Sequence, residues 1–379
     1  MPTSIPLVDL RREYARIHSE IDESIARVLH RGWFVLGEET ESFEEKWATY
    51  CGTSFAIGVG NGSDAIQLAL WAAGIGRGDE VVLPALTSAF TPSAVAIAGA
   101  QPVFADVDPE RYTLDPEALE SAITPQTAAV VPVHLYGCPA DMAPILDIAR
   151  RHSLLVVEDA SQAHGACYQA SRVGSLGDVA AFSFYPSTNL GAYGDAGAVT
   201  TNDAALAEKV RVLRHGGQHP VEVPGSLGAL ESQPLGISSR MDDIQAAVLR
   251  TKLDHLSGWN ERRRSVAARY HDGLCSTGPL VLPPTPDEAE LAHHRYLVRT
   301  RLRDRLREYL DGTGISSGVH AMRGQRLEAA YASLGYAPGS CPIAEQIASE
   351  AVLLPIFPQI SSAEVDKIVR LIRIFFAMH

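Results

Sequence analysis

The sequence predicts an α/β fold, with a mostly parallel sheet in a large domain and a smaller C-terminal α+β domain. Between residues 55 and 201, short apolar runs recur without polar alternation, which is typical of strands buried on both faces of a sheet. Helix-like segments separate these runs, as crossovers between parallel strands require. From Asp242 onward the pattern changes to a long segment with helical spacing.

The elements of the first part follow in a regular order. We expect strands at 55–60, 80–84, 102–107, 129–135, 154–158, 179–184 and 198–201, and helices at 63–73, up to 99, at 116–123 and at 141–152. Such an alternation places helices on both faces of one sheet.

The second part begins within a long helical segment. Ile244, Val248, Leu249, Leu253 and Leu256 recur at helical spacing. Proline-rich turns then lead into a strand at 294–300, and an amphipathic helix at 363–377 closes the chain. We therefore expect a large domain over 1–255 and a small domain over 256–379.

Composition excludes several classes of protein. The net charge of -13 over 379 residues disfavours nucleic acid as a partner, because a surface of that sign repels phosphates. No apolar run is long enough to span a membrane, and no secretory signal is recognisable. The five cysteines lack the spacing of a metal site or a disulfide framework, so we expect no metal and a cytoplasmic location.

Two motifs lie where α/β sheets bind ligands. Residues 60–65 read GNGSDA between a strand and a helix, a place where backbone N–H groups can hold an anion. Residues 158–165 read EDASQAHG at the end of an apolar strand. There Asp159 could hold a proton on the nitrogen of a pyridine ring, which makes that ring an electron sink.

A third motif completes a recognisable set. Residues 182–191 read FSFYPSTNLG and residues 194–198 read GDAGA. Together with IPLVDL at 5–10, VHLYG at 133–137 and SRMD at 239–242, these segments resemble the DegT/StrS family of nucleotide-sugar aminotransferases. The resemblance implies a fold-type-I aminotransferase-like fold, substrates that are nucleotide-linked keto-sugars, and a homodimer with shared active sites.

The resemblance also implies how a pyridoxal phosphate (PLP) cofactor would be held. Asp159 stands at the position that faces the pyridine nitrogen, Gln162 beside the pyridine hydroxyl, and Ser183 at a phosphate ligand. The expected cofactor-binding residues are Gly62, Ser63, Asp64, Ala65, Ser88, Asp159, Gln162, Ser183 and Ser238.

Three positions depart from the family pattern. The family's lysine, which forms a Schiff base with PLP and then moves a proton, is replaced by Thr188. Threonine has no amine, and its hydroxyl is a poor base at neutral pH. Ser88 replaces an aromatic residue that stacks on the pyridine ring, and Ser238 replaces an asparagine that reaches the partner subunit's phosphate.

These departures lead to the hypothesis of an enzyme that keeps the pocket but does not transaminate. It would use no cofactor and would carry out proton transfer, elimination or cyclisation on a carbonyl-bearing specialised metabolite or sugar, as a lyase, isomerase or cyclase. The expected catalytic residues are His164, Asp159, Tyr185 and Thr188. His164 is the expected acid–base group because imidazole titrates near neutral pH, and packing beside the site is its alternative role.

Three alternatives stay open. The first is a keto-sugar dehydratase that binds pyridoxamine phosphate (PMP) or PLP non-covalently, with His164 or His215 as its base. The second is a catalytically inactive homologue that acts as a binding partner. The third is a conventional sugar aminotransferase altered at its lysine. In the small domain, Met322 and Arg323 are further candidates for contact with a substrate phosphate or carboxylate.

Overall fold

The structure is a computed structural model that describes residues 4–218, 235–283, 285–319 and 334–379. Met322 and Arg323 lie outside the described residues. No helix in the part of the chain that the structure describes is both long and apolar enough to cross a membrane.

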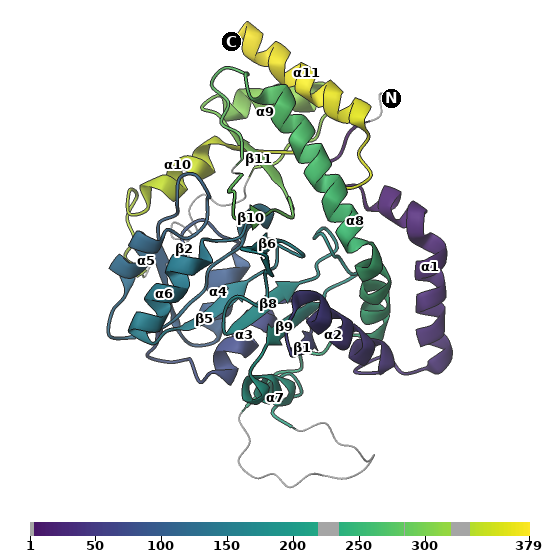
Figure 1. Cartoon of the computed structure of the whole chain (residues 1–379), viewed down its shortest axis with the longest axis vertical. Helices are drawn as coiled ribbons and strands as arrows, with labels where there is room; N and C mark the ends of the chain where they lie inside the picture. The colour runs from purple at the N-terminus through teal and green to yellow at the C-terminus, as the bar shows by residue number, and fades with distance from the viewer. Residues whose placement is uncertain (1–3, 219–234, 284, 320–333) are drawn as a thin grey trace.

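A seven-stranded sheet forms the centre of the molecule (Figure 1). Its strands lie in the order β1-β9-β8-β5-β4-β2-β3. The pairs within β8-β5-β4-β2-β3 are parallel, and β9 runs antiparallel to both of its neighbours. The strands are β1 (Phe55–Val59), β2 (Glu80–Pro84), β3 (Gln101–Ala105), β4 (Thr127–Val130), β5 (Leu155–Asp159), β8 (Val179–Ser183) and β9 (Gly197–Thr201).

Helices cover both faces of this sheet, as the lack of polar alternation predicts. In β2, Val81 and Leu83 face one apolar cluster and Val82 faces another, because successive side chains of a strand point to opposite faces. The first cluster contains side chains of α3 (Gly62–Ala72), α4 (Phe90–Ile97) and α7 (Ala204–Leu213), and the second contains side chains of α5 (Pro116–Ala122) and α6 (Met142–His152).

The long helix α8 (Asp243–Leu274) connects the sheet with the C-terminal part (Figure 1). It packs against α1 (Leu10–Arg31) and α2 (Glu38–Cys51). At its start, the Asp243 carboxylate accepts hydrogen bonds from the backbone N–H groups of Gly37 and Thr40, both at 3.0 Å. These bonds satisfy donors at the beginning of α2 and fix the two helices to each other.

The C-terminal part has an apolar core of its own. There β11 (Tyr296–Arg299) pairs antiparallel with β12 (Ala351–Leu354). Helices α9 (Arg303–Gly312) and α11 (Ser362–Met378) pack with the second half of α8 around this pair, and Ile5 from the N-terminal segment joins them. The remaining elements are η1 (Leu135–Gly137), β6 (Cys167–Tyr168), β7 (Ser171–Arg172), β10 (Ala289–Glu290) and α10 (Pro342–Glu350).

The structure confirms the α/β class with a mostly parallel large sheet. The strand predicted at 129–135 is shorter than expected, because β4 ends at Val130 and Pro132, which has no N–H, precedes the turn of η1. The division of the chain near residue 255 stays a prediction; α8 runs through that position without a break.

Candidate functional site

A cavity of about 740 Å³ opens at the carboxyl ends of β1, β5 and β8. Parallel sheets bind ligands at this end of their strands, and the volume lies in the range of small-molecule sites. The residues predicted from sequence that line it are Gly62, Ser63, Asp64, Ser88, Asp159, Gln162, Ser183, Tyr185 and Thr188.

The cavity has two walls. The strand-end wall is formed by Gly62, Ser63, Asp159, Gln162 and Ser183. The loop wall is formed by Tyr185, Ser187 and Thr188, which belong to the loop over residues 185–193 after β8, together with His294 from the segment before β11.

In the strand-end wall, the start of α3 is shaped to hold an anion. The Asn61 side chain caps the helix by accepting a hydrogen bond from the Asp64 N–H at 2.9 Å. The N–H groups of Gly62 and Ser63 have no acceptor among the described residues, so both are available to a ligand. A Cβ at Gly62 would lie 2.5 Å from the Cβ of Ser183, so only glycine lets α3 approach β8 this closely.

Asp159 is a buried carboxylate that forms no ion pair with any residue the structure describes. Its side chain lies at the end of β5 and is only 4% exposed. The Thr91 hydroxyl donates to one carboxylate oxygen at 2.7 Å, and the Ser161 N–H donates to the other at 3.1 Å. A buried carboxylate without a cation is costly, and a protonated pyridine nitrogen would supply the missing charge.

Gln162 has a fixed amide orientation. Its Oε1 accepts a hydrogen bond from the Tyr136 N–H at 2.9 Å, which leaves the amide N–H₂ group directed to other partners. An amide donor suits the oxygen of a pyridine hydroxyl. The donors of α3, the Asp159 carboxylate and this amide therefore fit a phosphorylated pyridine cofactor.

The loop wall carries Thr188, and its side chain is bonded to its own turn. Thr188 Oγ1 lies 2.8 Å from the carbonyl oxygen of Tyr185 and 2.9 Å from that of Leu190, and both can only accept. The hydroxyl proton is therefore directed at the loop backbone. An oxygen held in this way is neither a nucleophile nor an effective base.

No lysine among the described residues lines the cavity, although Lys252 lies behind the loop that carries Thr188. Its Nζ donates to the carbonyl oxygen of Gly191 at 2.7 Å, pairs with Glu13 at 2.7 Å, and lies 4.1 Å from the centre of the Tyr193 ring. The side chain is fully buried in these contacts. Lys252 thus supports the loop and does not reach the cavity.

Three predicted residues lie away from the cavity surface. Ala65 is buried inside α3, and Ser238 is an exposed residue whose hydroxyl accepts a hydrogen bond from Arg240 at 2.8 Å. His164 is fully buried and enclosed by the rings of Trp47, Phe182 and Phe184.

The environment of His164 favours a neutral, packed ring. Burial lowers its pKa to about 3, and the backbone of Ser183 opposes this shift only in part. Neither ring nitrogen forms a hydrogen bond of normal geometry with a described residue. The acid–base role of His164 stays a prediction without geometric support. His215, the other candidate base, also lies outside the cavity lining.

Sequence reasoning missed Thr91, Asp195 and His294, which also line the cavity. Thr91 lies in the first turn of α4, three positions after Ser88, and no motif marks it. His294 comes from a segment about a hundred residues beyond the motifs. Only the packing of β11 beside the sheet brings it to this site, so no local pattern could have identified it.

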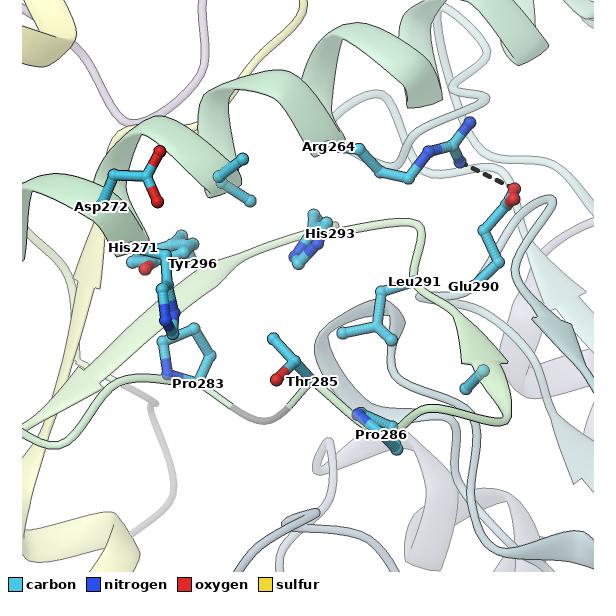
Figure 2. A pocket seen from close by; sticks show the side chains of 13 residues that line it. Arg264, His271, Asp272, Pro283, Thr285, Pro286, Glu290, Leu291, His293 and Tyr296 are labelled. Carbon is cyan, nitrogen blue, oxygen red and sulfur yellow. Dashed lines mark ion pairs between the residues drawn. The ribbon is translucent and has the colours of Figure 1, made fainter. Parts of the chain in front are cut away.

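A second cavity of about 530 Å³ lies between α8 and Pro283 together with residues 285–296 (Figure 2). Arg264 and Glu290 form an ion pair at 2.9 Å at one side of it. The His293 side chain lines this second cavity, whereas the neighbouring His294 lines the first. Two consecutive histidines therefore line two different cavities.

Comparison with known proteins identifies relatives along almost the whole chain. Residues 15–373 match the DegT/DnrJ/EryC1/StrS aminotransferase family. The dTDP-3-amino-3,4,6-trideoxy-alpha-D-glucose transaminase of Streptomyces venezuelae is 44% identical over 369 residues, which are 97% of this chain and 95% of that protein.

Solved structures agree with this match. S. venezuelae DesV, crystallised in complex with a ketimine intermediate, superposes with a TM-score of 0.94 at 44% identity and covers 99% of both chains. NtdA from Bacillus subtilis, with bound cofactor PMP, superposes with a TM-score of 0.86 at 30% identity, over 95% of this chain and 82% of that one. The expected fold-type-I aminotransferase fold is therefore confirmed.

These relatives overturn two hypotheses drawn from the sequence. The expectation of an enzyme that does not transaminate, acting as a lyase, isomerase or cyclase, is wrong, because close relatives are named sugar transaminases. The expectation that no cofactor is used is also wrong, because related structures contain the cofactor or an intermediate formed on it. The strand-end wall, with Asp159, Gln162 and Ser183 around one cavity, agrees with the activity of these relatives better than the threonine at position 188 alone suggests.

Proposed function

Because the chain belongs to the DegT/DnrJ/EryC1/StrS aminotransferase family, we propose that it transfers an amino group to a nucleotide-linked keto-sugar with the help of PLP and PMP. The observation that carries the proposal is the strand-end wall, where Asp159, Gln162 and Ser183 surround one cavity together with the start of α3. The named transaminase activity of relatives at 44% and 43% identity supports the same reaction.

Each group of the strand-end wall has a separate task. The N–H groups of Gly62 and Ser63 and the Ser183 hydroxyl would bind the phosphate, and the Gln162 amide would bind the ring oxygen. The Asp159 carboxylate would keep a proton on the pyridine nitrogen. When bound there, the cofactor supplies an electron sink for the bond that is broken at the neighbouring carbon.

Thr188 changes how the cofactor is retained. With no amine at this position, the strand-end wall must hold PLP or PMP through non-covalent contacts alone. The cofactor then exchanges with solution, and its aldehyde form needs no displacement from the protein before it meets an amino donor. We propose that this chain works as an aminotransferase with a dissociable cofactor.

The proposal includes a homodimer in the cytoplasm. Ser238 lies on the surface of this chain and outside its own cavity, as expected of a residue that serves the partner's site. Phe90 and Tyr185 line the cavity and are 70% and 57% exposed, so a second subunit would cover apolar surface at its mouth. Sedimentation of the purified protein at micromolar concentration tests this part.

The decisive experiment is a cofactor titration on the wild type and on Thr188→Lys. Calorimetry should show binding of PMP and of PLP to the wild type, with no gain in protein mass after borohydride reduction. Thr188→Lys should gain the mass of the cofactor after the same treatment. Mixing the PMP-loaded wild type with keto-sugar nucleotides should yield an amino sugar, detected by mass spectrometry.

The possible failures have different meanings. If the wild type binds neither form of the cofactor, the proposal is wrong and the cavity serves another ligand. If it binds PMP but releases a deoxygenated keto-sugar in place of an amino sugar, it is a dehydratase. Binding without any product from a panel of dTDP- and UDP-linked keto-sugars would indicate a binding protein. Ser121→Lys, a change on the exposed face of α5, controls for lysines that react nonspecifically.

A further inference from the structure

His294 is the residue that offers a basic nitrogen to the cavity. Among the described residues that line it, the others are apolar, hydroxylic, amide-bearing or acidic, and none is lysine or arginine. His294 lies just before β11 and is 5% exposed. An aminotransferase must move a proton between two carbons, and Thr188 cannot do this, so the position of His294 is of direct chemical interest.

A chain of hydrogen bonds fixes the protonation of the His294 ring. The Asn260 amide N–H₂ donates to the carbonyl oxygen of His164 at 2.7 Å. The Asn189 amide N–H₂ donates to the Asn260 Oδ1 at 2.9 Å and to the carbonyl oxygen of Ala292 at 2.7 Å. Because backbone carbonyls only accept, both amide orientations are determined without ambiguity.

The remaining atom of Asn189 decides the tautomer. Its Oδ1 lies 3.3 Å from His294 Nδ1 and can only accept, so Nδ1 must carry the hydrogen. No described residue pairs with Nε2, nor is Nε2 among the fully enclosed unpaired atoms. A neutral ring with its proton on Nδ1 has its lone pair on Nε2, and no described residue occupies that lone pair.

The surroundings keep this ring neutral. Burial lowers the pKa of His294 well below its usual value, and the nearby Arg295, Arg263 and His164 act in the same direction. The lone pair on Nε2 is therefore available throughout the physiological range of pH. A bound ligand that carries phosphate groups would oppose this shift and make Nε2 a stronger base, so basicity would rise when the site is filled.

We propose that His294 is a catalytic residue whose Nε2 moves the proton in the reaction of this chain, in place of the amine that Thr188 lacks. The proposal rests on the aminotransferase function proposed above. In the half-reaction with the keto-sugar, a C–H bond next to the transferred nitrogen would break on the cofactor side, its electron pair would stay with the bound substrate and cofactor, and the proton would form a bond with Nε2 before it is delivered to the sugar carbon. Returning that proton to the second carbon restores the neutral ring, so no other reactant is consumed.

His293 offers a matched control for this proposal. The His294→Asn variant keeps an N–H donor near Nδ1 and removes Nε2, whereas His293→Asn makes the same change in the neighbouring residue, whose ring lines the second cavity (Figure 2). Both variants should bind PMP with affinities within about threefold of the wild type. With keto-sugar under single-turnover conditions, His294→Asn should be slower by a factor of about 10² to 10⁴, and His293→Asn by less than about threefold.

A second measurement, on the tautomer of the His294 ring in the wild type, needs no turnover. In ¹⁵N-labelled wild-type protein without cofactor, the long-range nitrogen–proton spectrum should show one buried histidine protonated on Nδ1 at neutral pH. Asn189→Ala removes the acceptor and should shift this histidine toward protonation on Nε2. Rescue of part of the lost rate by added imidazole in His294→Asn would support the same role.

The outcomes separate this inference from the function on which it rests. A wild type that transaminates together with a His294→Asn variant of equal rate would overturn the role of His294 alone. A His294 ring protonated on Nε2 in the wild type would also overturn it. If the wild type binds cofactor but forms no amino sugar, the proposed function fails, and the proton-transfer role of His294 fails with it.

Discussion

The strand-end wall and the loop wall enclose the same cavity but are held in different ways. In the strand-end wall, each polar group comes from the last residue of a strand, from the first turn of α3 or from the turn after β5, so its position follows from local structure. In the loop wall, residues 185–193 depend on distant partners. Lys252 and Gln245 of α8 bind Gly191 and Tyr193, and Asn260 binds Asn189.

This difference bears on which wall tolerates the substitution of a residue that lines the cavity. Besides the two hydrogen bonds of the Thr188 hydroxyl to loop carbonyls, Asn189, Gly191 and Tyr193 hold the loop through contacts that do not involve the side chain of residue 188. A Cβ at Gly191 would lie 2.4 Å from the carbonyl oxygen of Pro186, so the turn itself is tightly constrained. We therefore expect the loop and the cavity to persist when residue 188 is substituted.

Among substitutions in the strand-end wall, Asp159→Asn is expected to weaken the binding of PMP most. The variant keeps the shape of the side chain and removes the charge that faces the pyridine nitrogen. A lost hydrogen bond between charged groups costs about 1.5–3 kcal/mol, so PMP should bind about 10- to 100-fold more weakly by calorimetry. Asp147→Asn, an exposed change on α6, should leave the affinity unchanged. Equal affinity of Asp159→Asn and the wild type would mean that the ring nitrogen lies elsewhere.

An intermediate effect, on the pH dependence of stability, is expected from His164→Phe, because the His164 ring packs among aromatic side chains behind the strand-end wall. In the folded protein the pKa of His164 is about 3, below the ordinary value of 6.5. As the pH falls, His164 is therefore protonated in the unfolded chain before it is protonated in the folded protein, which favours unfolding. The contribution of His164 to the free energy of unfolding is fully present above pH 6.5 and is lost progressively toward pH 3. Between pH 7 and pH 5 the wild type should lose about 2 kcal/mol of unfolding free energy through His164.

The measurement is urea unfolding at several pH values. In His164→Phe, the free energy of unfolding should change less between pH 7 and pH 5 than it does in the wild type. The affinity for PMP should stay within about threefold of the wild type. His30→Phe, an exposed substitution on α1, provides the control. Loss of transamination with intact cofactor binding in His164→Phe would restore the acid–base role that the sequence suggests for this residue.

The sequence predicted the strand-end wall better than the loop wall, for a physical reason. Strand ends and helix starts are encoded by apolar runs, glycines and caps within about ten residues, so Asp159, Gln162 and Gly62 could be placed by pattern. His294 and Asn260 reach the site through the packing of α8 and β11, which no local pattern records. Thr188 lines the cavity, and its correspondence to the family's lysine stays a prediction; the conclusion drawn from it, that the chain does not transaminate, was wrong.

The smallest effect is expected at Ser88, which lies at the boundary between the sheet and α4 and lines the cavity. A serine supplies little surface to a pyridine ring, whereas a stacked aromatic pair contributes about 0.5–1.5 kcal/mol beyond area burial. Ser88→Phe should therefore tighten PMP binding by about 2- to 10-fold, measured by calorimetry, while Ser121→Phe on the exposed face of α5 should not. Weaker binding in Ser88→Phe would mean that the bound ring already fills this space, and that the strand-end wall positions the cofactor in this chain without a stacking partner.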